Sequence, residues 1–148
     1  MQTINILEEV KQAWGWVGID PIELVTENEF GNLIIKDAKD QFWRLCPEDV
    51  YCEIVANSIA AYNELIQDEE FLDDWFMTTM VEEAKKSLGE LKPDRKYHLV
   101  IPGVLGGEYT GKNIKTVPFI ELIRFSGDLG KQIKDLPDGA EIELKTTP

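Results

Sequence analysis

The chain has 148 residues, of which 43% are hydrophobic, and its formal net charge is −13 at pH 7. This length and composition fit one globular domain with a sizeable core and exclude intrinsic disorder. The acidity argues against a nucleic-acid partner, because binding phosphate relies on basic side chains. No apolar run has the length of a bilayer-spanning helix, and acids rather than bases follow the first residues. The sequence therefore predicts a cytoplasmic protein with no membrane partner.

The first elements are expected to be a helix and then a β-meander. Apolar residues recur at helical spacing over residues 4–14, and Gly15 is expected to end this helix. Within residues 22–56, turn residues separate four extended segments at the short spacing typical of hairpins. The strands are expected over residues 22–26, 33–36, 42–45 and 50–55.

Helices are expected over residues 58–89. Ser58 can cap a short helix, and a longer apolar face indicates a second helix from about Glu70 to Gly89. The bases Lys85 and Lys86 near its end suit the negative pole of the helix dipole.

Residues 97–145 are expected to form a strand, a loop, a helix and a last strand. The strand covers residues 97–101, and the helix begins after Pro118, where Gly127 and Gly130 imply close packing or a kink. The last strand is expected over residues 141–144. Together the elements predict an α+β fold, a single domain over residues 1–148 with a largely antiparallel sheet packed by helices.

The glycine-rich loop after residue 101 is the most specific motif. Gly106 and Gly107 are expected to adopt backbone angles closed to residues with a Cβ atom. A nucleotide-binding reading fails, because Lys112 is followed by Asn113 where a P-loop needs serine or threonine. The motif therefore indicates shape recognition rather than chemistry.

Several short motifs follow one another in a fixed order. They are Asp74-Trp75-Phe76, Leu105-Gly106-Gly107-Glu108-Tyr109 with Asn113-Ile114, and Phe125-Ser126 with Leu129-Gly130. With Phe30-Gly31-Asn32 and Phe42-Trp43-Arg44-Leu45 upstream, the chain resembles a family of bacterial immunity proteins over roughly residues 22–142. That family is typified by the C-terminal domain of proteins that protect type VI secretion cells from their own DNase toxins. The resemblance implies a protein that binds a cognate toxin and blocks its active site, without catalysis.

Charge is distributed unevenly along the chain. Residues 1–84 hold 19 acids and 4 bases, whereas residues 85–148 hold 9 acids and 11 bases. A surface of one sign speeds encounter with a basic protein, although an acidic face can also serve solubility alone. The expected partner contacts are the acids Glu64, Asp68, Glu69, Glu70, Asp73 and Asp74, together with Leu105, Glu108, Tyr109 and Asn113 of the loop.

Other functions have less support. His98 is the sole histidine and has no nucleophile motif around it, and calcium ligation by the Asp68–Asp74 acids is interrupted by two apolar residues. We therefore expect no metal and no cofactor. Two alternatives stay open: a regulatory or housekeeping protein-binding module of the same fold, and a hydrolase that uses paired carboxylates.

The two cysteines flank a predicted turn. A short-loop disulfide between Cys46 and Cys52 is conceivable from their spacing, but two reduced and mostly buried thiols are expected in a cytosolic protein.

Overall fold

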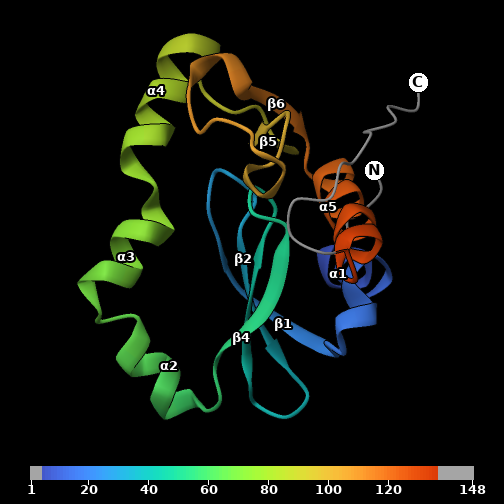
Figure 1. Ribbon diagram of the computed structural model, residues 1–148. Helices are drawn as coiled ribbons and strands as arrows, with labels where there is room; N and C mark the ends of the chain where they lie inside the picture. Colours follow the sequence, from blue (N-terminus) through green and yellow to red (C-terminus); the bar gives the residue numbers. More distant parts are fainter. Residues whose placement is uncertain (1–4, 137–148) are drawn as a thin grey trace.

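The centre of the fold is an antiparallel meander of four strands, which the computed structural model describes within residues 5–136 (Figure 1). The strands are paired in the order β1-β2-β3-β4. The prediction of a largely antiparallel sheet in an α+β fold is confirmed, with strands close to the expected positions. Their bounds are β1 Pro21–Glu27, β2 Leu33–Asp37, β3 Phe42–Cys46 and β4 Tyr51–Ala56.

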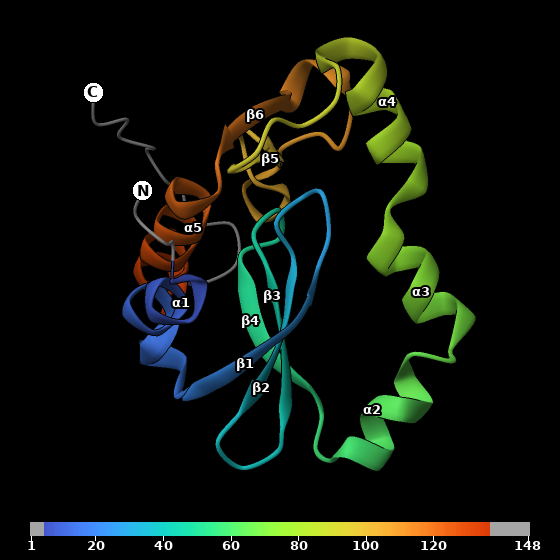
Figure 2. The same cartoon turned by 180° about the vertical axis from the view of Figure 1, so that it is seen from behind.

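Helices cover both faces of this sheet. Figures 1 and 2 show α1 (Ile6–Trp14) and α5 (Phe119–Ile133) on one side, and α2 (Ile59–Leu65), α3 (Glu69–Phe76) and α4 (Thr78–Leu88) on the other. Residues of β2 and β3 are therefore buried on both faces, which explains why these strands carry nearly continuous apolar runs. None of the described helices is long and apolar enough to cross a membrane.

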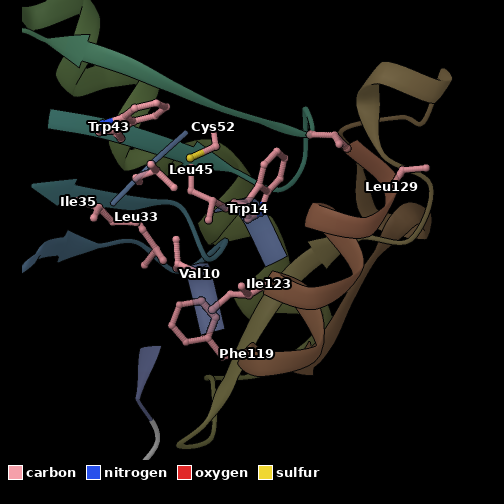
Figure 3. Close-up of a cluster of buried hydrophobic side chains, with 12 residues drawn as sticks. Val10, Trp14, Leu33, Ile35, Trp43, Leu45, Cys52, Phe119, Ile123 and Leu129 are labelled. Atoms are coloured by element: carbon pink, nitrogen blue, oxygen red, sulfur yellow. The ribbon is translucent and has the colours of Figure 1, made fainter. Parts of the chain in front are cut away.

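The largest apolar cluster lies between the sheet and the α1–α5 pair. Figure 3 shows Val10 and Trp14 of α1 and Ile123 of α5 directed toward Leu33 and Leu45 of the sheet. A side chain at Gly127 would place its Cβ atom 2.4 Å from the carbonyl oxygen of Ala13, so this glycine lets the two helices approach. The predicted close packing at the α5 glycines is confirmed.

The first helix ends at Trp14 with Gly15 as its C-cap, as predicted, but the chain does not leave the helical path there. Gly15 keeps right-handed helical angles, and the chain continues in a short 3-10 turn, Gly15–Val17. Gly18, with φ of 94°, provides the left-handed residue that ends it. Within this turn Trp16 stacks on Trp14 with ring centroids 5.4 Å apart, and its Nε1 donates to the carbonyl of Gly127 at 3.2 Å. Trp16 therefore fixes α1 to α5.

The prediction of one long helix over residues 70–89 is wrong, because the helix is interrupted at Met77. This residue adopts left-handed angles, with φ of 49°, between α3 and α4. Asn28 Nδ2 donates to the Trp75 carbonyl at 2.8 Å, so a side chain from the β1–β2 turn takes the place of the next helical donor. A residue far away in the sequence thus stabilises the break.

A second, two-stranded sheet packs against α4. It pairs β5 (Arg95–Leu99) with β6 (Ile114–Pro118) in antiparallel register. Its buried residues form a separate cluster with the β1–β2 turn and α4, made of Phe30, Val81, Ala84, Tyr97, Leu99 and Ile114. The strand predicted over residues 141–144 lies outside the described residues.

Candidate functional site

All six acids predicted as partner contacts on residues 64–74 are exposed, on α2, on α3 and at the N-cap of α3. Two of them also have structural roles. Asp68 caps α3, since its Oδ1 accepts from the backbone nitrogens of Glu70 at 2.9 Å and Phe71 at 3.4 Å. Asp74 Oδ2 accepts from Arg44 Nη1 at 2.5 Å.

The other four acids differ from this pair. The carboxylates of Glu64, Glu69, Glu70 and Asp73 have no hydrogen-bond or ion-pair partner within residues 5–136. We call these four residues the acidic face. A single-sign surface whose charges are not neutralised by neighbouring bases is the kind that steers an oppositely charged partner.

Arg44 connects this helical layer to the sheet. Its side chain is buried, with Nε and Nη2 donating to Asn32 Oδ1 at 3.0 and 2.9 Å, and its guanidinium lies 5.3 Å from the centre of the Trp75 ring. Asn32 Nδ2 in turn donates to both Glu48 carboxylate oxygens, at 3.0 and 2.8 Å. A buried polar network therefore runs from Asp74 through Arg44 and Asn32 to Glu48.

Glu48 is a buried carboxyl at the end of that network. It is 5% exposed and also accepts from the Cys46 thiol at 3.0 Å. Burial raises the pKa of Glu48 above its ordinary value, and the hydrogen bonds from Cys46 and Asn32 offset only part of this rise. Burial, and then the charge of Glu48, likewise raise the pKa of the Cys46 thiol.

The structure also settles the arrangement of the cysteines. Both are free, and Cys46 is paired across the ladder with Tyr51 whereas Cys52 is paired with Leu45. Leu45 and Cys46 are neighbours in β3, so their side chains point to opposite faces of the sheet. Cys52 is on the face of its partner Leu45, in the core cluster under α1 and α5, whereas Cys46 lies toward Glu48. The prediction that both thiols are buried is confirmed.

Replacing Glu48 with glutamine is expected to change how stability depends on pH. A carboxyl whose pKa rises on folding stabilises the folded state most below the ordinary glutamate pKa of 4.5, and this contribution is lost as pH rises through the folded-state value. Relative to wild type, Glu48→Gln should therefore become more stable as pH rises above the ordinary glutamate pKa of 4.5. Urea unfolding at each pH measures the difference, with Glu53→Gln as an exposed control. Parallel stability curves for wild type and Glu48→Gln would contradict the expectation.

The glycine-rich loop is held by side chains as well as by its backbone. Asn113 Nδ2 donates to the carbonyls of Ile101 at 2.8 Å and Glu108 at 2.7 Å, and its Oδ1 accepts from the Ile101 nitrogen at 2.9 Å. Gly106 has φ of 89°, as expected, but Gly107 is not left-handed. The reason for glycine at 107 is instead a close approach, since its Cβ atom would lie 1.7 Å from the Ile101 carbonyl oxygen.

The four predicted contact residues of the loop have different positions. Leu105 packs against the main core cluster, and the Tyr109 hydroxyl donates to the Asp49 carboxylate. The Asn113 side chain makes the hydrogen bonds within the loop that are described above. Of the four residues, only Glu108 has a side chain without a hydrogen bond or core contact in the described part of the chain. The backbone nitrogen of Gly103 donates to the Glu48 carbonyl at 2.7 Å, which joins the loop to the residue that ends the buried network.

Two features of the described residues bear on catalysis or metal binding. His98 is half-buried, and burial followed by the charge of Arg95 lowers its pKa. Cys46, Glu48 and Asp49 bring donor atoms within 4.8 Å of one another, a grouping that sequence analysis missed. These donors are already engaged with one another, with Asn32 and with Tyr109.

The chain also matches a known protein family. A family model described as "T6SS immunity protein Tdi1, C-terminal" matches residues 56–130. The matched segment contains α2, α3, α4, the second sheet, the glycine-rich loop and most of α5. It thus includes the acidic face and every residue predicted to contact a partner. No curated protein matches the chain.

Proposed function

Because the chain belongs to the family of type VI secretion immunity proteins described by the Tdi1 C-terminal model, we propose that it neutralises a DNase-type effector toxin by binding it and blocking its active site. The protein acts by binding alone, in the cytoplasm, and has no substrate of its own. The observation that carries the proposal is the family match over residues 56–130, the segment that presents the acidic face.

Charge supports the choice of a nuclease as the target. An enzyme that binds the phosphate backbone needs a basic surface around its active site. An acidic protein can compete for that surface, and association between such oppositely charged proteins is fast. The segment from residue 45 to residue 84 contains no lysine, arginine or histidine, so nothing within it weakens the attraction.

The carboxylates of α2 and α3 are also placed better for binding than for hydrolysis. A catalytic carboxylic acid is commonly buried or crowded by another carboxylate, which shifts its pKa toward the working pH. Glu64, Glu69, Glu70 and Asp73 are all exposed instead. Exposure leaves them free to meet a partner and is the reason we favour inhibition over a carboxylate-dependent hydrolase.

We take the reading frame adjacent to this gene as the candidate toxin, and co-expression of the two is expected to restore growth. The purified pair should co-elute, with a dissociation constant on the order of nanomolar, as is typical of tight specific complexes. A toxin variant without nuclease activity serves as the control for growth, and an unrelated acidic protein of similar size serves as the control for charge. If the toxin kills equally well with and without this protein, the proposed function is wrong.

A further inference from the structure

One aromatic side chain on helices α2 and α3 lies outside the buried clusters of the described residues. Phe76, the last residue of α3, is 57% exposed, more than any other large hydrophobic side chain in the described part of the chain. It belongs to none of the three buried clusters, whereas its neighbours Phe71 and Trp75 both pack in the cluster beneath α3. Burying an exposed phenylalanine would be a large gain for any complex.

The spacing of α3 places this side chain among acids. Glu69, Asp73 and Phe76 are separated by four and three residues, so they form a single stripe along one side of the helix. Phe71 and Trp75 occupy the opposite side, toward the sheet. Phe76 is thus an apolar group on the side of α3 that carries two residues of the acidic face.

The backbone beneath Phe76 is held in place. Asn28 donates to the carbonyl of the preceding residue, Trp75, and the Trp75 ring lies against the Arg44 guanidinium. Met77 then turns the chain out of the helix. An aromatic side chain on an ordered backbone loses less conformational freedom on binding, which is the property of interface anchors.

We propose that Phe76 is the apolar anchor of the toxin interface and enters an apolar pocket of the toxin that lysine and arginine side chains surround. This inference rests on the proposed function and adds the chemistry of the surface that is recognised. Charge complementarity selects that partner over a second copy of this chain, because two acidic faces would repel each other. Glu69 and Asp73 meet the basic rim, while Phe76 fills the centre, the usual position of a hot-spot residue.

The test compares two exposed phenylalanines. Phe125 on α5 is 41% exposed and serves as the matched control for Phe76. Against the nuclease-inactive form of the adjacent toxin, Phe76→Ala is expected to raise the dissociation constant at least about 30-fold, and Phe125→Ala no more than about threefold. The loss should appear in the dissociation rate and persist at high salt, because it is apolar in origin.

Thermal unfolding of both variants shows whether they are folded. Phe76→Leu keeps apolar volume, should lose about threefold to tenfold in affinity, and replaces the alanine variant if that one does not fold. Wild-type affinity of the folded Phe76 variant, or equal losses at Phe76 and Phe125, would overturn the inference while the proposed function stands. A wild-type protein that does not bind the toxin would overturn both. If the isolated protein forms a homodimer and Phe76→Ala dissociates that dimer, Phe76 serves self-association, and the inference is also overturned.

Discussion

Gly107→Ala is expected to lower the free energy of unfolding by about 3 kcal/mol, the upper end of what overpacking produces. The new Cβ atom would lie 1.7 Å from the carbonyl oxygen of Ile101 and 2.9 Å from Asn113 Nδ2. The loop could make room only by breaking the bonds that Asn113 donates to Ile101 and Glu108. Urea unfolding monitored by tryptophan fluorescence measures the change.

Gly106→Ala is the matched control for this substitution. Its Cβ atom would meet no other atom within 4 Å, so the expected penalty comes from its φ of 89° alone. A left-handed residue with a Cβ atom is disfavoured by about 1–2 kcal/mol. Equal stability losses at the two positions would show that steric contact with Ile101 is not what requires glycine at 107.

Reversing the acidic face is expected to slow association with the toxin at least about tenfold at low salt. The four substitutions are Glu64→Lys, Glu69→Lys, Glu70→Lys and Asp73→Lys. Asp68 and Asp74 are kept, because the first caps α3 and the second is the carboxylate partner of the buried Arg44. Stopped-flow mixing over a salt series measures the rate, and the difference from wild type should shrink as salt screens the charges.

A second fourfold variant controls for net charge. Asp20→Lys, Glu121→Lys, Asp128→Lys and Asp135→Lys change the total charge equally, at exposed positions outside α2 and α3. If steering depends on the acidic face, this variant should associate within about threefold of the wild-type rate. If both variants slow association equally, the effect comes from total charge. If the first variant does not slow association, the acidic face serves solubility alone.

The order and type of the described elements could be predicted because their signals are local. Turn residues at the short spacing of hairpins placed β1 to β4, and helical spacing placed α1, α2 and α5. The break at Met77 has no such signal, since Thr78 to Leu88 continue the apolar periodicity. The contact that stabilises the break comes from Asn28, which is 47 residues from the Trp75 carbonyl to which it donates.

The candidate site shows the same division. Exposure of the six acids could be inferred from their spacing on helices, and the importance of the glycine loop from its composition. The partners of Asp74 and Asn113 could not, because Arg44 is 30 residues from the first and Ile101 is 12 residues from the second. The sequence therefore identifies which segments are exposed, but it does not distinguish side chains that hold the fold from those without such a contact.

In helix α3, the residues that attach the helix to the sheet are different from the residues on its outward side. Phe71, Trp75 and Asp74 attach it to the sheet, whereas Glu69, Asp73 and Phe76 are exposed and belong to no buried cluster or ion pair within residues 5–136. Substitutions of Asp73 and Phe76 are therefore expected to be nearly neutral for stability. When the surface of the toxin changes, mutations along one side of this helix can restore binding. The specificity of the protein can therefore change while its core stays the same.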